Sequence, residues 1–318
     1  MHRPRILIVA DVPGWAWGRR ARAYRRHLGD QFQITMSYLA DPLPDPSGFD
    51  LVHLFEVSQL DRVSDPRPYS PRPYRLVAGL TAHVWRTWGP ERMHRWASRC
   101  DALHGNSLLL VDELKPFHPS VCYLPNGVDA ERFRPPEVPR SGEVVFGHVG
   151  KPTARKGGAL IVEAARRAGV ALLVNQRTSR VALDEDSMAA WYRGVDVEVT
   201  ASNMDGTPNP MLEAAATGCA LLSTPIGNMI EFIGSGVNGF FLPPLPGREE
   251  GRAPLPSEAP EVGLLSDAMV ELMEWFRDRP DETREMGRRA RESILEEWTW
   301  EKQVLRVAKF WREVLDFQ

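Results

Sequence analysis

The chain has 318 residues, of which 43% are apolar and 25% are charged, and its formal net charge is -3. This balance is typical of an ordinary globular protein and excludes a collagen and a disordered chain. At roughly 100 to 200 residues per domain, the length predicts two domains, each large enough to bury a core of its own.

The three cysteines, Cys100, Cys122 and Cys219, are too few and too scattered for a disulfide framework, and they lack the spacing of a zinc site. We therefore expect three buried, reduced thiols and no metal. The first apolar run, residues 6–10, is shorter than the apolar region of a signal peptide. Since no run reaches the roughly 18 apolar residues of a spanning helix, we expect a cytoplasmic protein without a transmembrane segment.

Short β-branched runs alternate with helical stretches along the first part of the chain. The predicted strands are 5–10, 32–38, 51–55, 74–80 and 102–104, and the predicted helices are 19–27, 93–98 and 108–114. This alternation predicts a parallel sheet that is covered by helices on both faces.

A proline-rich break at residues 125–139 separates the two parts of the chain, because so many prolines suit neither a helix nor an inner strand. The alternation then resumes. The predicted strands are 144–149, 171–175, 195–200 and 220–223, and the predicted helices are 159–168, 184–192, 211–217, 264–277 and 301–315. We predict one domain over residues 1–137 and a second over 138–298.

The most informative stretch begins at Asp205 and contains a second carboxylate, Glu213, eight positions later. Asp205 lies in a predicted loop and Glu213 near the start of a predicted helix, with Gly206 and Pro208 shaping the turn between them. The unpaired N–H groups and the positive dipole end of such a helix suit a phosphate or diphosphate. Glu213 would then accept hydrogen bonds from ribose hydroxyls. Spacing alone leaves a capped helix with a solvated glutamate as the alternative.

A second stretch, residues 147–158, combines glycines and cations between a predicted strand and a predicted helix. Glycines let a ligand approach the backbone closely, and Lys151 and Lys156 supply charge for a diphosphate. The spacing is neither that of a P-loop nor that of a dinucleotide fingerprint. Taken alone, this stretch is equally consistent with a solvated turn.

Together with residues 124–133, these stretches resemble glycosyltransferase family 4, a group of nucleotide-sugar-dependent enzymes of GT-B fold. The similarity rests on motifs that follow one another in the family's order. They are a Pro-Asn-Gly-Val-Asp stretch from Pro125, a basic loop with Gly150, Lys151, Lys156 and Gly157, a Glu213-Ala214 helix, and the downstream Gly227 and Glu231. The resemblance covers about residues 101 to 242 and is weaker before residue 100.

The resemblance implies an α/β protein of GT-B fold, in which two Rossmann-like, doubly wound domains face a cleft. Residues 299–318 would form a C-terminal helix that returns to the N-terminal domain. The implied reaction is a retaining transfer of a sugar from a nucleotide diphosphate donor, held by the second domain, to an acceptor on the first. No metal or other cofactor is implied, and a UDP-sugar is slightly preferred over a GDP-sugar as donor.

Carried over position by position, the resemblance makes Lys151 and Lys156 ligands of the diphosphate and Glu213 a ligand of the ribose. Asp205 stands where the family has a glutamate, near the donor sugar, so its shorter side chain sets the carboxylate back. The further candidate donor contacts are Gly14, Gly150, Gly206, Thr207, Asn209, Met211 and Leu212. The expected nucleotide-base region contains Asn175, Arg177 and Arg180.

The family also carries a histidine after a strand of its first domain, close to the reacting carbon, and His83 is the best match here. His83 and Asp205 are therefore the candidate catalytic residues, without an assigned general base. The loop after the first strand would face the cleft, since ligands lie outside the carboxyl ends of parallel strands. Its Trp15 and Trp17 are candidates for stacking on the acceptor, with a packing role as the alternative.

Five arginines within eight residues suggest a contact with nucleic acid or an anionic membrane surface, against a solvated helix face as the plainer interpretation. They are Arg19, Arg20, Arg22, Arg25 and Arg26. The acceptor is accordingly a small molecule, a glycan, a lipid-linked molecule or a nucleic acid. One alternative function is glycosylation of nucleic acid, as in DNA base modification. Another is non-catalytic binding of a nucleotide sugar, which the departure at Asp205 supports.

Overall fold

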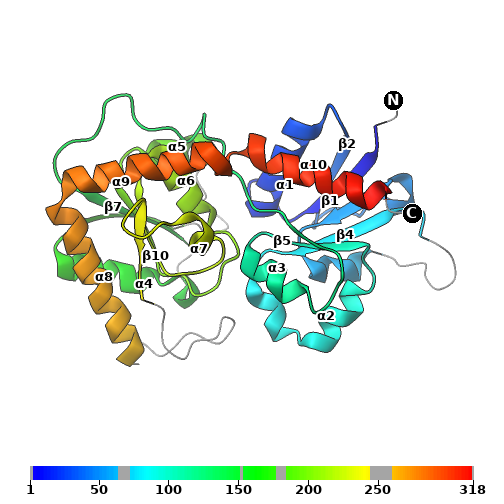
Figure 1. Cartoon of the computed structure of the whole chain (residues 1–318), viewed down its shortest axis with the longest axis horizontal. Helices are drawn as coiled ribbons and strands as arrows, with labels where there is room; N and C mark the ends of the chain where they lie inside the picture. Colours follow the sequence, from blue (N-terminus) through cyan, green and yellow to red (C-terminus); the bar gives the residue numbers. More distant parts are fainter. Residues whose placement is uncertain (1–2, 64–71, 151–152, 177–183, 244–259, 317–318) are drawn as a thin grey trace. The chain divides into compact units, whose positions relative to one another are not determined.

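The structure is a computed structural model that describes residues 3–63, 72–150, 153–176, 184–243 and 260–316. The chain forms two compact units (Figure 1). Unit 1 comprises residues 1–127 and 300–318, and unit 2 comprises residues 128–299. Each unit is an α/β structure built on one parallel sheet, as the alternating sequence pattern predicts.

Unit 1 has a parallel sheet with the strand order β2-β1-β3-β4-β5-β6. Its strands are β1 (Arg5–Ala10), β2 (Gln33–Tyr38), β3 (Leu51–Leu54), β4 (Arg75–Leu80), β5 (Ala102–Gly105) and β6 (Val121–Tyr123). Its helices include α1 (Ala16–Leu28), α2 (Pro90–Ala97), α3 (Leu108–Leu114) and α10 (Trp300–Asp316). In this order the chain switches direction across the sheet between β1 and β3.

Alternate residues of β1 enter two different apolar clusters of unit 1, because successive side chains of a strand point to opposite faces. Ile6 and Ile8 join the cluster that contains residues of α1 and α10, which lie side by side in Figure 1. Leu7 and Val9 join the cluster that contains residues of α2. The sheet is thus buried on both faces, which explains its continuous apolar strands.

Unit 2 repeats this strand order as β8-β7-β9-β10-β11. Its strands are β7 (Val145–Gly150), β8 (Ala171–Gln176), β9 (Val197–Thr200), β10 (Ala220–Ser223) and β11 (Gly239–Phe241). Its helices include α4 (Gly158–Ala168), α5 (Glu185–Tyr192), α6 (Asn209–Thr217), α7 (Met229–Phe232), α8 (Pro260–Asp278) and α9 (Pro280–Ser293). The chain switches direction here between β7 and β9.

The boundary between the units lies ten residues before the predicted one, at 127/128 instead of 137/138. Val128 pairs with Thr299 in an isolated parallel bridge of unit 2. Phe133, within the proline-rich stretch, is buried in an apolar cluster of unit 2 next to Tyr192. Phe133 therefore packs the part of this stretch after residue 127 against unit 2, and the second crossing falls at 299/300.

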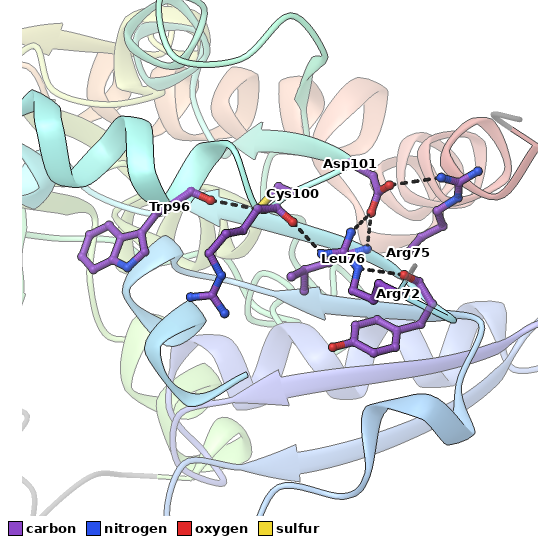
Figure 2. A network of polar contacts seen from close by, with 8 residues as sticks. Arg72, Arg75, Leu76, Trp96, Cys100 and Asp101 are labelled. Carbon is purple, nitrogen blue, oxygen red and sulfur yellow. Dashed lines mark hydrogen bonds and ion pairs between the residues drawn. The ribbon is translucent and has the colours of Figure 1, made fainter. Parts of the chain in front are cut away.

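An aspartate just before β5 connects that strand to β4 at their amino ends (Figure 2). Asp101 Oδ2 accepts a hydrogen bond from the backbone N–H of Leu76 at 2.7 Å and another from Arg72, while Oδ1 accepts one from Arg75 at 3.1 Å. Arg72 also donates to the carbonyl of Tyr74 at 2.9 Å. The carboxylate thus holds a strand N–H and two guanidinium groups in one network.

The same arrangement recurs before β3 and β9. Asp50 accepts a hydrogen bond from the backbone N–H of Arg5 at 2.7 Å, and Asp196 accepts one from Val145 at 2.9 Å. Asp196 is buried and also pairs with Arg140 at 3.2 Å. These aspartates align the amino ends of neighbouring strands, so the opposite, carboxyl edges of both sheets are held in register as well.

Helix α1 does not expose all five arginines of the proposed basic patch. Arg20 is buried, where its guanidinium donates to the Tyr24 hydroxyl at 2.5 Å and to the Leu124 carbonyl at 2.6 Å. Arg25 and Arg26 are exposed, and Arg19 and Arg22 are half-buried. Arg20 therefore belongs to the core of unit 1, and the expectation that it contacts a nucleic acid or a membrane is wrong.

All three cysteines are free thiols, as predicted, but only Cys100 and Cys219 are buried, whereas Cys122 is half-buried. Burial raises the pKa of Cys122 to about 11 and that of Cys219 well above its usual value. These two thiols are thus protonated near neutral pH and poorly reactive. Among the described residues, no helix combines the length and the apolar character that crossing a membrane requires.

Candidate functional site

The carboxyl edge of the unit 2 sheet holds both segments that the sequence singles out. Lys156 follows β7, and Asp205 follows β9 and precedes α6. Strands β7 and β9 flank the point where the chain switches direction, at which doubly wound sheets bind their ligands. The predicted donor residues therefore lie where the topology favours a site.

Strands β7 and β9 separate toward this edge. Their pairing ends at Gly147 and Glu198. Beyond that point the Val149 N–H donates to Glu198 Oε1 at 3.0 Å, and His148 donates through Nδ1 to the Val199 carbonyl at 2.9 Å. Burial lowers the pKa of His148, so the ring is neutral near pH 7. The side chains of Glu198 and His148 thus form hydrogen bonds with backbone groups of β7 and β9 that no longer pair with each other where the strands separate.

Lys156 and Asp205 form an ion pair in this opening. The lysine Nζ lies 2.8 Å from Oδ1 and 2.6 Å from Oδ2 of the aspartate. The two side chains are only 18% and 15% exposed. Sequence analysis assigned the lysine to the diphosphate and the aspartate to the sugar, and the structure brings the two charges into direct contact.

The loops that carry this pair are bonded to each other along their backbones. The Arg155 carbonyl accepts a hydrogen bond from Asn203 N–H at 3.1 Å, and the Arg155 guanidinium donates to the Met204 carbonyl at 2.9 Å. Gly157 has a φ of +66°, and a Cβ there would lie 2.6 Å from the Ala201 carbonyl oxygen. Only glycine fits this approach, so the residue after Lys156 is required for the two loops to meet.

A third loop, between β10 and α7, packs on the residue after Asp205. Gly227 has a φ of +49°, and a Cβ there would lie 2.2 Å from the Gly206 carbonyl oxygen. That same oxygen accepts a hydrogen bond from Asn228 N–H at 2.9 Å. The downstream glycine of the family motif therefore has a structural reason here, because it admits the backbone of residues 205–206.

Helix α6 begins at this edge and carries Glu213, which is 2% exposed. The alternative of a solvated glutamate is thus excluded. Met211 and Leu212 pack in the apolar core of unit 2, and the Met211 N–H donates to the Pro208 carbonyl at 2.9 Å. Of the predicted donor contacts on this segment, Thr207 and Asn209 are half-buried at the amino end of the helix.

The predicted base region is described only at its first residue. Asn175 lies at the end of β8 and is half-buried, with its amide donating to the Met188 sulfur at 3.2 Å. Lys151, Arg177 and Arg180 lie outside the described residues.

In unit 1, the loop after β1 leads into α1. Gly14 is exposed with a φ of +90°, and Trp15 is 38% exposed at the start of the helix. Trp17 is half-buried, packs beside Phe55 and donates through Nε1 to the Thr81 hydroxyl at 3.3 Å. Its indole thus connects α1 to the end of β4, whereas Trp15 presents its ring at the surface.

Glu56, at the carboxyl end of β3, is a buried acid that sequence analysis missed. Its Oε2 accepts hydrogen bonds from the Thr81 hydroxyl at 3.2 Å and the Thr81 N–H at 3.4 Å, and its Oε1 accepts one from Val57 N–H at 3.2 Å. Burial raises the pKa of Glu56 to about 8, although these hydrogen bonds oppose the rise. The acid is therefore mostly protonated near pH 7. The Glu-x-x-Gln spacing of Glu56 and Gln59 is that of a capping box, and it is the one sequence pattern that points to an ordered Glu56 side chain.

His83 is fully buried two residues after Thr81. Its Nδ1 lies 2.8 Å from Oε1 of Glu113 on α3, and the same carboxylate accepts hydrogen bonds from Trp85 and Arg86. Burial acts to raise the pKa of Glu113, but these donors outweigh it and lower the pKa below its usual value. An ionised Glu113 thus fixes the orientation of the imidazole, a role that the sequence did not reveal.

The described parts of the chain therefore bring the predicted residues together in two groups, one in each unit. In unit 2, Lys156 contacts Asp205 in the loop that leads to α6, whereas in unit 1 Trp17 donates to Thr81, two residues before His83. No group of three or more His, Cys, Asp or Glu side chains among the described residues could hold a metal ion.

Comparison with known proteins shows a family similarity for part of the chain and a fold for the whole of it. Residues 138–249 match the family described as Glycosyl transferases group 1. This similarity covers about a third of the chain and lies within unit 2. The matched residues include Lys156, Asp205, Glu213 and Gly227. A comparison with curated protein sequences finds no match.

Solved structures of GT-B glycosyltransferases share the fold of the whole chain. Sucrose-phosphate synthase from Thermosynechococcus elongatus has a TM-score of 0.76 at 13% identity, covering 99% of this chain and 100% of its own. A glycosyltransferase from Rickettsia africae has a TM-score of 0.71 at 12% identity, covering 100% of both chains. Anabaena HepE, solved in complex with UDP-glucose, has a TM-score of 0.67 at 11% identity, covering 98% of this chain and 100% of its own. The predicted GT-B fold is thus confirmed.

Proposed function

We propose that this GT-B protein transfers a sugar from a nucleotide diphosphate donor to an acceptor, with retention of the anomeric configuration. The observation that carries the proposal is the Lys156–Asp205 pair. It lies in hydrogen-bonded loops at the switch point of the unit 2 sheet, among the residues that match Glycosyl transferases group 1 and in the loop that leads to α6. These are the positions at which the family resemblance expects the donor.

The donor diphosphate would be held by the Lys156 ammonium and the amino end of α6, with Lys151 as a further cation. Cleavage of the sugar–phosphate bond leaves additional negative charge on the diphosphate, and fixed positive charge and N–H groups stabilise it. Glu213 would accept hydrogen bonds from the ribose. The UDP-glucose complex of Anabaena HepE supports a uridine donor for this fold.

The acceptor would bind to unit 1 at the carboxyl edge of its sheet, where Trp15 follows β1 and His83 follows β4. Glu113 fixes the His83 ring, which supports a defined hydrogen-bonding direction on the acceptor side. In a retaining transfer, the departing diphosphate can take the acceptor's proton on the attacked face. The reaction would thus need no side-chain general base.

Calorimetry with UDP, GDP, ADP, dTDP and their common sugar conjugates tests the proposal. We expect selective binding of one nucleotide diphosphate and its sugar conjugate by the wild-type protein, weakened in Lys156→Ala. Absence of binding by all of them would refute the proposed donor class. Release of nucleotide diphosphate from the bound conjugate, with water or an acceptor panel, distinguishes an enzyme from a protein that only binds the nucleotide sugar.

A further inference from the structure

We propose that Asp205 is a positioning residue, which orients the Lys156 ammonium toward the donor diphosphate and does not contact the donor sugar. This inference rests on the proposed function, because it assigns a role within the same donor site. It differs from what the family resemblance implies, which is a longer acid at this position beside the sugar.

The geometry of the ion pair is the first support. An ammonium group has three N–H donors, and Asp205 lies within hydrogen-bonding distance through both of its oxygens, at 2.8 and 2.6 Å from Nζ. The lysine side chain is a flexible four-carbon stem, so a partner that holds its end removes rotamer freedom before a ligand arrives. With both side chains mostly buried, this contact is less screened than a surface ion pair.

The backbone around Asp205 is the second support, because it fixes the position from which the short side chain extends. The Met204 carbonyl before it is bonded to Arg155, and the Gly206 carbonyl after it is bonded to Asn228. Gly227 packs against the same backbone, with its added Cβ position only 2.4 Å from the Asp205 carbonyl oxygen. The carboxylate is thus held at a distance that suits Lys156.

The experiment compares three ligands that differ by one group each. For a uridine donor they are uridine, UDP and UDP-glucose, measured by calorimetry on the wild-type protein and on Asp205→Asn. Losing the charged partner of Lys156 should weaken UDP and UDP-glucose by the same factor, about tenfold to a hundredfold, and leave uridine unchanged. Another nucleoside series replaces uridine if the wild-type protein selects it.

A double-mutant cycle tests whether the two residues act as one unit. We expect Asp205→Asn in a Lys156→Ala background to have no further effect on UDP affinity, since the group that it positions is gone. The matched control is Asp267→Asn, which removes the carboxylate of an exposed pair with Arg167 elsewhere in unit 2. This control should leave all three affinities unchanged.

Several results would overturn the proposal. If Asp205→Asn weakens UDP-glucose and leaves UDP unchanged, the Asp205 carboxylate contacts the sugar. A gain in UDP affinity in Asp205→Asn would show that Asp205 competes with the diphosphate for Lys156. If the two substitutions had additive effects on UDP affinity, Asp205 and Lys156 would act independently and the proposal would be wrong. A wild-type protein that binds no nucleotide diphosphate would instead refute the proposed function, so the two failures are distinguishable.

Discussion

Replacing Glu56 by glutamine should remove a pH dependence of stability that the buried acid creates in unit 1. The pKa of Glu56 is raised from 4.5 to about 8, chiefly because burial disfavours the charged form. Between these two values the folded state binds one more proton than the unfolded state, so the free energy of unfolding falls as pH rises. One pKa unit corresponds to about 1.4 kcal/mol, so the loss between about pH 5.5 and pH 7.5 is about 2 to 3 kcal/mol.

Glutamine matches the protonated acid in shape and keeps an oxygen for the Val57 N–H, while its NH2 group takes the place of Oε2 and loses the weak hydrogen bond from the Thr81 N–H. Denaturant unfolding of the wild-type protein and Glu56→Gln over this pH range isolates Glu56, since the contributions of other groups cancel in the difference. Hydrogen exchange of β1 and β4 amides assigns the effect to unit 1. We expect the variant to gain about 2 to 3 kcal/mol relative to the wild-type protein as pH rises. Parallel stability profiles would refute a buried, protonated Glu56.

Three further perturbations test other parts of the structure. Burial lowers the pKa of His104 to about 3, so the folded state binds fewer protons than the unfolded state below pH 6.5. Acid should therefore destabilise unit 1, with His104 contributing about 2 kcal/mol at pH 5, and His104→Gln should flatten this part of the denaturation profile. Asp196→Asn, which removes the buried carboxylate charge beside the partly exposed Arg140, should lower the free energy of unfolding by about 1.5 to 3 kcal/mol, and an unchanged denaturation midpoint would contradict its tethering role. Glu213→Ala should weaken nucleotide binding by about 1.5 to 3 kcal/mol in calorimetry, and unchanged affinity would remove Glu213 from the site.

The inner strands could be predicted from the sequence because they are buried on both faces. The continuous apolar runs at residues 5–10 and 220–223 coincide with β1 and β10. Strands β6 and β11 were not predicted, since each has three residues at an edge of its sheet. Helix α9 was also missed. It contains Arg–Glu pairs along its exposed face and few apolar positions, although its first helical residue is Pro280.

The candidate site could be predicted in part. Motif spacing identified Lys156 and Asp205 separately, but 49 positions divide them along the chain. Their contact depends on the adjacency of β7 and β9 and on the left-handed backbone at Gly157, neither of which a motif expresses. Glu113 belongs to no motif in the sequence, and only the fold brings it to His83.

The two sheets share one strand order, yet their switch points differ in charge, and this difference bears on which unit holds the donor. At the end of β3, Glu56 is mostly protonated near neutral pH, and the Trp17 N–H donates to Thr81, so these groups offer hydrogen bonds with little charge. Beside β7 and β9, the Lys156 ammonium, which is paired with Asp205, and the N–H groups at the amino end of α6 offer charge-assisted hydrogen bonds where water is partly excluded. An anionic diphosphate gains far more from fixed positive charge and helix N–H groups than from neutral donors, whereas a hydroxyl group is well served by neutral ones. The repeated fold alone would allow either assignment, but the charges support the donor in unit 2 and the acceptor in unit 1.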